Sequence, residues 1–300
     1  MGTTQNKPEK YSLSVIIPAF QEEAGIAGVL SGLRAALEAR RGDLVEEFEL
    51  LVVDDGSSDG TAAAAERCGA RVVRHPTNMG YGRTLLTGFQ NARFDWLLMI
   101  DADGSYPPDQ VLKVLEEGAG FDMVIGARQG AFFWGSPFRA LLRRIYLFIA
   151  GFVAGVRIPD ANSGLRLVHK PVLTVTMPVL CYGYSFSTTM TLSFLQGGRF
   201  VRFVPIAFRE RQGKSKVSML RDILRTLQIM VQVVLYYNPL KFAAVLAMIP
   251  GALCAAFSLR HLAFGSFGDL ALAVQCGLSA LFVFLFGCLL DSLRIRNKGL

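Results

Sequence analysis

Short apolar runs alternate with polar turns and mixed segments over about the first 215 residues. The apolar runs have the length and composition of buried strands, and they lie at 13–17, 49–53, 70–74 and 96–100. The segments between them are typical of helices, and they lie at 25–39, 62–68 and 83–92. This alternation predicts an α/β fold with an open, largely parallel sheet and helices on both faces.

The pattern changes near residue 240, after which the chain is almost continuously apolar as far as residue 290. Two spans in this region contain no charged residue, Phe242 to Leu259 and Leu270 to Leu290. Each is close to the roughly 20 residues that a helix needs to cross the hydrocarbon core of a bilayer. The spans therefore predict a transmembrane helical hairpin. A buried helical hairpin within a soluble domain is the alternative.

Two shorter segments are typical of helices that lie in the headgroup region of a membrane. Residues 145–156 form an apolar run fenced by arginines, too short to cross a bilayer. Residues 219–237 carry apolar side chains at helical spacing, with arginines on another face. Packing in a protein core is the alternative for both. We expect three parts: an α/β domain at 1–217, an interfacial amphipathic helix at 218–239, and a hairpin with a cytoplasmic tail at 240–300.

The distribution of charge predicts how the hairpin is oriented. The chain has a formal net charge of +7, is 52% hydrophobic and has a mean hydropathy of +0.38. Lys241, Arg294, Arg296 and Lys298 flank the two spans on their outer sides, whereas the connector between them contains Arg260. The positive-inside rule then predicts a multi-pass protein of the cell membrane, with the large domain and the C-terminus in the cytoplasm. The positive charge suits an anionic membrane or anionic substrates, and no nucleic-acid-binding motif accompanies it.

Acidic residues follow three of the predicted strands. Glu22 follows the first strand, Asp54 and Asp55 the second, and Asp101 and Asp103 the fourth. Taken alone, each could be a solvated start to a helix, where a carboxylate interacts favourably with the helix dipole. In an open α/β sheet, however, the ligand crevice lies outside the carboxyl ends of the strands, so three acidic ends indicate one shared site. Carboxylates accept hydrogen bonds from a nucleotide base and ribose, and alternate carboxylates suit Mg²⁺ or Mn²⁺.

Six short motifs occur in a fixed order along the chain: PAFQEE, DDGSSDGT, NMGYG, DADGSYPP, DANSGLR and RQGKSK. Together they resemble the family 2 glycosyltransferases, most closely the polyprenyl-phosphate (dolichyl-phosphate mannose synthase-like) branch. The motifs cover about residues 12 to 217, and the paired apolar spans match a subset of that branch. The resemblance implies a GT-A fold, a GDP- or UDP-sugar donor, a Mg²⁺ or Mn²⁺ ion, and an undecaprenyl or dolichyl phosphate acceptor.

The resemblance also implies roles for individual residues. The donor nucleoside is expected at Pro18, Glu22, Asp54 and Asp55, and the metal and diphosphate are expected at Asp101 and Asp103, with Arg128 beside them. Three positions depart from the family pattern: Gln21 stands where Asn is frequent, Ser105 where Gln is frequent, and Thr189 where an acidic residue is frequent. Ser105 leaves open whether a side chain or a water completes the metal site, and Thr189 leaves the identity of the sugar open.

The chemistry of the acceptor decides the predicted mechanism. A phosphate monoester has a second pKa of about 6 and is largely dianionic at neutral pH, so it needs cations to position it rather than a general base. The residues predicted to bind the acceptor phosphate are Arg144, Arg157, Ser163, Arg166, Arg211, Ser215 and Lys216, and Arg143 is a further candidate. For Arg143 and Arg144, anchoring to lipid headgroups is the alternative. We expect an in-line, inverting transfer in which Asp101, Asp103 and Arg128 are the catalytic residues.

Other functions stay open on the sequence alone. A transferase that acts on a lipid hydroxyl needs a general base, and no carboxylate outside the donor set is assigned to that role. A processive polysaccharide synthase is expected to carry Arg-Trp and Glu-Asp dipeptides, and neither occurs in the chain. A membrane scaffold with a degenerate transferase domain is disfavoured because both metal aspartates are present. The oligomeric state is not predicted.

Overall fold

A computed structural model describes residues 10–176, 186–209, 228, 231–232, 235 and 238–298. The chain forms two compact units, Met1–Leu227 and Gln228–Leu300. The three-part division at residues 217 and 239 stays a prediction. Its middle part, the amphipathic segment at 218–239, lies mostly outside the described residues.

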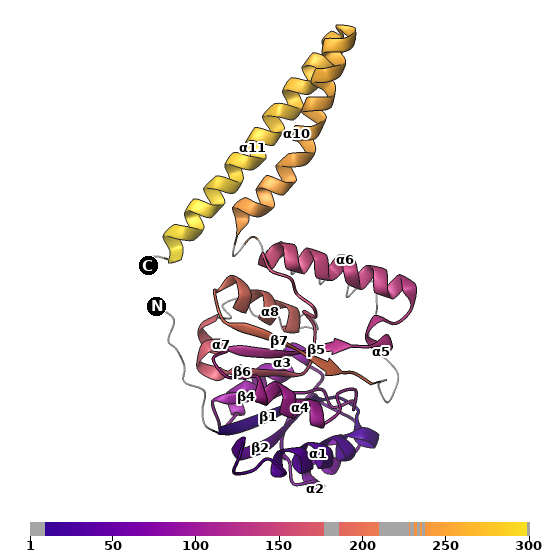
Figure 1. The fold of residues 1–300 in the computed structure, drawn as a ribbon, viewed down its shortest axis with the longest axis vertical. Helices are drawn as coiled ribbons and strands as arrows, with labels where there is room; N and C mark the ends of the chain where they lie inside the picture. The colour runs from indigo at the N-terminus through magenta and orange to yellow at the C-terminus, as the bar shows by residue number, and fades with distance from the viewer. Residues whose placement is uncertain are drawn as a thin grey trace. The chain divides into compact units, whose positions relative to one another are not determined.

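The first unit is built on a mixed sheet of seven strands in the order β3-β2-β1-β4-β6-β5-β7 (Figure 1). The strands are β1 (Tyr11–Ala19), β2 (Val45–Asp54), β3 (Arg71–Arg74), β4 (Trp96–Met99), β5 (Met123–Gln129), β6 (Arg166–His169) and β7 (Val201–Ala207). Neighbours β3, β2, β1 and β4 are parallel, as are β5 and β7. The order of the strands reverses beside β1, the place where open α/β sheets form their ligand crevice.

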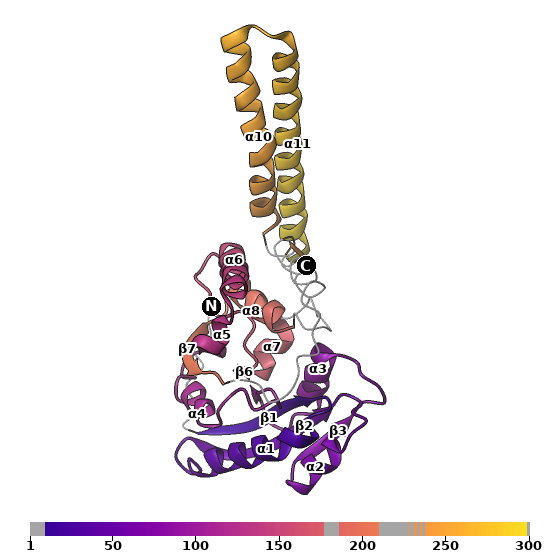
Figure 2. The same cartoon turned by 90° about the vertical axis from the view of Figure 1, so that its right-hand side faces the viewer.

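Helices cover both faces of this sheet, as the alternating sequence pattern predicts (Figure 2). They are α1 (Glu23–Glu38), α2 (Thr61–Arg67), α3 (Tyr81–Asn91), α4 (Asp109–Glu116), α5 (Ala131–Trp134), α6 (Pro137–Ala154), α7 (Lys170–Thr176) and α8 (Phe186–Gln196). Residues of α1, α2 and α4 pack in one hydrophobic cluster, and residues of α3, α7 and α8 pack in a second cluster across the sheet.

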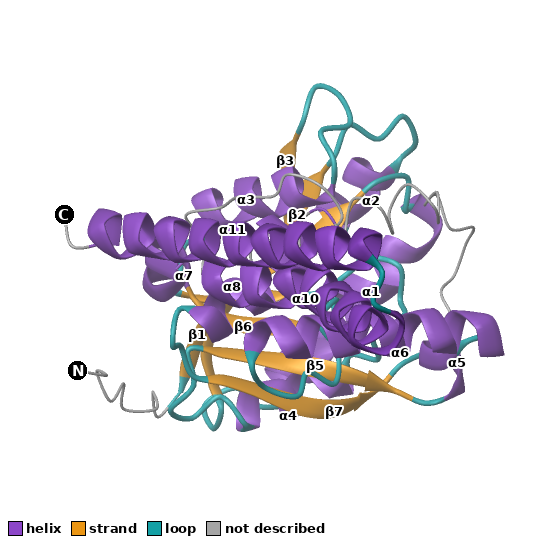
Figure 3. Ribbon diagram, turned by 90° about the horizontal axis from the view of Figure 1, so that it is seen from above, coloured by secondary structure: helices purple, strands orange, loops and turns teal. Residues whose placement is uncertain are grey.

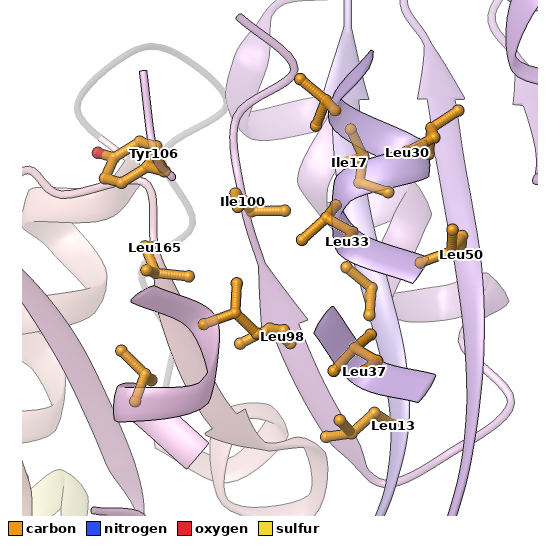
Figure 4. Packing of buried hydrophobic residues seen from close by; sticks show 14 of the residues in the cluster. Leu13, Ile17, Leu30, Leu33, Leu37, Leu50, Leu98, Ile100, Tyr106 and Leu165 are labelled. Carbon is orange, nitrogen blue, oxygen red and sulfur yellow. The ribbon is translucent and has the colours of Figure 1, made fainter. Parts of the chain in front are cut away.

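The packing of α1 on β1 shows how the sequence pattern produces these two clusters. Leu30, Leu33 and Leu37 recur at helical spacing and are completely buried against the sheet (Figure 4). In β1, Leu13 and Ile17 belong to this cluster, whereas the intervening Ile16 belongs to the cluster on the opposite face. Successive residues of a strand point to opposite faces, so a run that is apolar throughout fits a sheet covered on both sides.

The alternating pattern predicts none of β5, β6 and β7, and β6 also departs from the expected parallel order of the sheet. Strand β6 runs antiparallel to both of its neighbours, β4 and β5, and Figure 3 shows β5, β6 and β7 among the orange strands of the sheet. Arg166 at the start of β6 is paired with Met99 at the end of β4. The loop that precedes β6 therefore lies at the same edge of the sheet as the acidic strand ends.

The second unit is a hairpin of two long apolar helices, α10 (Pro239–Phe264) and α11 (Phe267–Lys298). Their candidate membrane spans have 26 and 29 residues. Only 6% and 11% of the most apolar stretch of each helix is buried inside the structure. The two helices of the hairpin pack closely where their side chains are small. A Cβ added to Gly287 of α11 would overlap Ala243 of α10. The predicted helical hairpin is confirmed and its apolar helices are exposed, unlike those of a soluble core, whereas its crossing of a membrane stays a prediction.

Candidate active site

A cleft of about 270 Å³ lies at the carboxyl ends of β1, β2 and β4. Six of the predicted site residues line it, namely Pro18, Glu22, Asp55, Asp101, Asp103 and Arg128. The cleft is also lined by residues that were not predicted, among them Tyr81, Asn162, Gly164 and Ser187. Tyr81 lies in the NMGYG motif, and Asn162 and Gly164 lie in the DANSGLR motif, so membership of a motif was the available sequence signal. Thr189 is completely buried in α8 and is not among the lining residues.

Two hydrogen bonds hold the end of β1 against the turn that follows β2. The backbone N–H of Gln21 donates to Oγ of Ser57 at 2.9 Å, and that of Glu22 donates to Oγ1 of Thr61 at 2.9 Å. Gln21 has a φ of 54° and is the one residue other than glycine with a positive φ in the described ranges. Asn adopts this left-handed conformation more readily than most residues, because its short polar side chain can hydrogen-bond locally, and the longer Gln21 lacks that advantage.

The neighbouring aspartates after β2 have different environments. Asp54 is completely buried, and its carboxylate accepts from the backbone N–H of Ser57 and from Nε of Arg74, both at 3.1 Å. It is not among the residues that line the cleft and it holds the turn, while its contact with the donor nucleoside stays a prediction. Asp55 does line the cleft, and it accepts from Nδ1 of His75 at 2.8 Å.

Asp101 is held by two neighbours from other parts of the chain. The hydroxyl of Tyr81 donates to Oδ1 of Asp101 at 2.9 Å. Burial, and then the Asp101 carboxylate, raise the pKa of Tyr81 well above its usual value, so the hydroxyl stays a donor. A Cβ added to Gly164 would overlap the Asp101 carboxylate, so only glycine fits there. These contacts fix the Asp101 carboxylate at the cleft.

Asp103 and Asp101 together fit the oxygen ligands that a hard divalent cation prefers. Both line the cleft, and Oγ of Ser105 donates to Oδ1 of Asp103 at 2.6 Å. The Ser105 hydroxyl therefore orients Asp103, and because it acts as the donor, its oxygen lone pairs stay available. In the described ranges, no three His, Cys, Asp or Glu side chains cluster as a metal site.

Arg128 enters the cleft from the end of β5 and is fixed by Asp160. Its Nε and Nη2 donate to the two carboxylate oxygens of Asp160 at 2.7 and 3.0 Å. The guanidinium carbon lies 5.3 Å from the ring centroid of Phe133 and 5.2 Å from that of Phe208. Burial would lower the pKa of Arg128, but Tyr106 and Asp160 beside it raise the pKa above its ordinary value. The cleft therefore contains a fixed cation.

Ser163 and Arg166 do not have the position expected of residues that bind the acceptor. Both are completely buried, and neither lines the cleft. Nε and Nη2 of Arg166 donate to the carbonyl oxygens of Ser163 and Ala161 at 2.8 and 2.9 Å, and Nη1 donates to Thr191 at 2.8 Å. Burial lowers the pKa of Arg166 to about 10, which leaves it charged at neutral pH. The described contacts of these residues hold the loop that precedes β6, and their binding of the acceptor phosphate stays a prediction.

The other predicted acceptor residues have mixed positions. Arg144 and Arg157 are exposed, and the guanidinium of Arg144 lies 5.5 Å from the ring centroid of Trp134. Arg143 is partly buried, and its guanidinium lies 4.4 Å from the centroid of the Phe133 ring that Arg128 also approaches. Burial, and then Arg128, lower the pKa of Arg143. Arg211, Ser215 and Lys216 lie outside the described residues.

A family model described as Glycosyl transferase family 2 matches residues 14–175. The undecaprenyl-phosphate mannosyltransferase of Micrococcus luteus is 31% identical over 217 residues, covering 68% of this chain and 86% of the relative. The polyprenol monophosphomannose synthase of Mycolicibacterium smegmatis is 31% identical over 220 residues, covering 68% and 80%. An undecaprenyl-phosphate 4-deoxy-4-formamido-L-arabinose transferase of Pseudomonas aeruginosa is 30% identical over 226 residues, covering 70% and 61%.

Solved structures show the same fold at lower sequence identity. The glucosyl-3-phosphoglycerate synthase of Mycobacterium tuberculosis, solved with Mn²⁺, UDP and glucosyl-3-phosphoglycerate, superposes with a TM-score of 0.59 at 22% identity, covering 74% of this chain and 79% of that one. The mannosyl-3-phosphoglycerate synthase of Rubrobacter xylanophilus superposes with a TM-score of 0.57 at 24% identity, covering 74% and 72%. The predicted GT-A fold is thereby confirmed.

Proposed function

This chain belongs to glycosyltransferase family 2, and from that premise we propose that it transfers a sugar from a GDP- or UDP-sugar to a polyprenyl phosphate. The product would be a polyprenyl-phosphate sugar formed with inversion at the anomeric carbon. Three curated relatives carry names that state transfer to, or mannosylation of, a polyprenyl or undecaprenyl phosphate. These relatives support the same class of acceptor for this chain.

One observation carries the proposal: the acidic ends of three parallel strands meet a fixed arginine in one cleft. Glu22, Asp55 and the Asp101–Asp103 pair come from β1, β2 and β4, and Arg128 comes from β5. Carboxylates suit the hydroxyl and N–H groups of a nucleoside, whereas a guanidinium suits a diphosphate. The cleft therefore has the two kinds of groups that a nucleotide-sugar requires.

The cleft favours a phosphate acceptor over a hydroxyl acceptor. Its acidic lining residues are Glu22, Asp55, Asp101 and Asp103, all of which belong to the proposed donor set. Asp160 is close by but is committed to Arg128 through a bidentate ion pair. The described lining residues therefore leave no acidic group for the general base that an alcohol acceptor requires, whereas a phosphate dianion requires none.

In the proposed mechanism, an acceptor phosphate oxygen attacks the anomeric carbon in line with the departing nucleoside diphosphate. Arg128, held by Asp160, stabilises the negative charge that develops on the leaving diphosphate. Asp101 and Asp103 would hold a Mg²⁺ or Mn²⁺ ion, which supplies further positive charge beside that diphosphate when it is bound. Holding the two substrates in this geometry supplies much of the remaining acceleration.

Positive side chains near α5 and α6 are proposed to guide the acceptor phosphate. Arg144 and Arg157 are exposed there, and the partly buried Arg143 shares the Phe133 ring with Arg128. A role in binding the acceptor phosphate is also proposed, from the sequence, for Arg211, Ser215 and Lys216. The catalytic unit would work at the cytoplasmic face of the membrane, where the hairpin anchors it.

A donor panel tests the proposal directly. Purified full-length protein would receive short-chain polyprenyl phosphate, Mg²⁺ or Mn²⁺, and GDP- or UDP-linked mannose, glucose and N-acetylhexosamine. Mass spectrometry should detect one polyprenyl-phosphate sugar, and free polyprenol of the same length should give no product. Transfer to free polyprenol would favour the hydroxyl-acceptor alternative. A failure to bind any nucleoside diphosphate would favour the degenerate scaffold.

A further inference from the structure

One phenyl ring, that of Phe133 in α5, contacts guanidinium groups from two other elements. The guanidinium carbon of Arg128, at the end of β5, lies 5.3 Å from the ring centroid, and that of Arg143, in α6, lies 4.4 Å from it. Both distances are within the roughly 6 Å at which a cation is attracted to the face of an aromatic ring. Phe133 is only 3% exposed, so the ring packs against protein rather than water. Phe133 thus connects Arg128, which lines the cleft, to α6.

The two arginines bring positive charges close together. Burial, and then Arg128, lower the pKa of Arg143, because like charges disfavour each other. Asp160 balances one of the two charges through its bidentate ion pair with Arg128. An anion beside Arg143 would balance the other. In the proposed reaction the leaving diphosphate and the acceptor phosphate meet at the anomeric carbon, so a pair of cations matches this pair of anions.

The two guanidinium groups are supported to different extents. Arg128 is held by Asp160 and by the ring of Phe208, whose centroid lies 5.2 Å away, in addition to Phe133. Within the described residues, the Phe133 ring is the one aromatic, hydrogen-bonding or ion-pair partner of the Arg143 side chain. Without the ring, Arg143 would lose more rotational freedom when it binds an anion, and such a loss weakens binding. The ring therefore matters more for Arg143 than for Arg128.

We propose that Phe133 is a positioning residue, which fixes Arg143 beside Arg128 so that Arg143 binds the acceptor phosphate. This inference rests on the proposed function, since it concerns the acceptor of that same reaction. Arg128 lines the cleft with Asp101 and Asp103, and it is the cation proposed for the donor diphosphate. Loss of the attraction between ring and cation should therefore weaken acceptor binding and leave donor binding nearly unchanged.

Fluorinated phenylalanine tests the role of the ring with little change in its shape. Phenylalanine with one, two or three ring fluorines, incorporated at position 133 of the full-length protein, progressively removes negative charge from the face of the ring. Binding of farnesyl phosphate, a short polyprenyl phosphate, would be measured in detergent free of phospholipid, with Mn²⁺ and UDP or GDP present. We expect its Kd to rise with each fluorine, to a total of roughly three- to thirtyfold. The Kd of the nucleotide, measured without farnesyl phosphate, should change by less than about twofold.

Phe208 is the matched control, because its ring contacts Arg128 at nearly the same distance and, within the described residues, does not contact Arg143. The same fluorine series at position 208 should change the Kd of farnesyl phosphate by less than about twofold. The series at position 133 should also have no effect in Arg143→Ala protein, where the guanidinium that the ring holds is missing. Thermal unfolding curves check that each protein folds. Phe133→Leu, which removes the ring, and Phe133→Tyr, which keeps it, make the same comparison if a fluorinated protein does not fold.

The possible results separate this inference from the proposed function. A Kd of farnesyl phosphate that does not respond to fluorine at position 133 would overturn the inference and leave the proposed transfer to polyprenyl phosphate intact. An equal loss of farnesyl phosphate and nucleotide binding would also overturn it, because the ring would then support the whole site. If the unaltered protein bound farnesol as tightly as farnesyl phosphate, the proposed acceptor would be overturned, and the role of Phe133 with it.

Discussion

At the scale of single residues, the groups that line the cleft are oriented by other parts of the chain. Tyr81 holds Asp101, Ser105 holds Asp103, and Asp160 holds Arg128. Each of these supporting side chains donates to or accepts from a group that would otherwise rotate freely. Catalytic groups held in this way need little rearrangement when the substrate binds, and electrostatic stabilisation benefits most from such preorganisation.

Asp103→Asn should sharply lower sugar transfer while leaving the thermal unfolding curve nearly unchanged. The substitution keeps the size of the side chain but removes one of the two negative charges proposed to hold the divalent ion. Addition of a chelator should silence the unaltered enzyme, and added Mg²⁺ or Mn²⁺ should restore it. Initial rates measured by mass spectrometry provide the check. Full activity in metal-free buffer would remove the metal from the proposed mechanism.

Arg166→Met should destabilise the protein by about 2–5 kcal/mol, because buried carbonyl oxygens of the loop before β6 lose their donors. Thermal unfolding in detergent measures the effect. Arg144→Met is the matched control, since Arg144 is exposed, and it should change stability by less than about 0.5 kcal/mol. If Arg166→Met had normal stability and only a raised acceptor KM, this result would instead support the predicted role of Arg166 in binding the acceptor phosphate.

At the scale of secondary structure elements, α6 differs from the other helices around the sheet because one of its faces is apolar and exposed. Its buried residues are Ala150 and Val153. Its exposed apolar stripe comprises Phe138, Leu141, Ile145, Phe148 and Phe152, which recur at helical spacing. The helix begins at Pro137 and ends before Gly155, so it is longer than the apolar run at 145–156 that predicts it. This exposed apolar face favours the predicted position of the segment at 145–156 in the headgroup region of a membrane over packing in a protein core.

A tryptophan placed on the stripe should report contact with lipid. In nanodiscs, the variant Phe148→Trp has one more emitting tryptophan than the parent protein. Brominated lipids should strongly quench this additional emission, because the stripe would lie at the headgroup boundary. Val175→Trp on α7 is the matched control, since Phe148 and Val175 are 74% and 73% exposed. Equal quenching of the two tryptophans, or none at position 148, would argue against a membrane-bound α6.

The contact between α3 and β1 makes a second test at this scale. A Cβ added to Gly88 of α3 would overlap Cγ2 of the completely buried Ile16. Gly88→Ala should therefore cost about 1–3 kcal/mol of stability through overpacking. Gly28→Ala on α1 is the control, because nothing lies within 4 Å of its added Cβ, and it should be neutral or stabilise by about 0.5–1 kcal/mol. Thermal unfolding measures the stability of both variants. Equal stability of Gly88→Ala and Gly28→Ala would refute the packing argument.

At the scale of the whole molecule, the chain joins a catalytic unit to a pair of helices with the length and hydropathy of membrane spans. The acceptor class supported by the relatives is a membrane lipid, so the hairpin would keep the enzyme where its acceptor is concentrated. Basic residues on the outer sides of the hairpin predict that both ends of the chain face the cytoplasm.

Reporter fusions test this topology. An alkaline phosphatase fused after Leu300 should be inactive and a green fluorescent protein fused there should fluoresce, because this end is expected in the cytoplasm. The same pair inserted near Ser266, in the connector of the hairpin, should behave in the opposite way. The same result at both positions would mean that the hairpin does not cross the membrane.

The sequence by itself determined the α/β alternation, the acidic ends of the strands and the apolar hairpin, because each depends on residues close together in the chain. The period of apolar residues distinguishes strand, helix and span before any long-range contact forms. Parallel strands then bring their carboxyl ends to one edge of the sheet, which is why Glu22, Asp55 and Asp101 could be predicted to meet.

Only the tertiary structure decided which neighbours of those residues reach the cleft. Asp54 and Asp55 are adjacent in the chain, but one is buried under the turn and the other lines the cleft, since successive residues at a strand end point in different directions. The antiparallel insertion of β6 between β4 and β5 brings Asp160 and Gly164 to Arg128 and Asp101, and it buries Arg166. Pairing between strands that are distant in sequence leaves no periodic signal, so the sequence pattern could not reveal it.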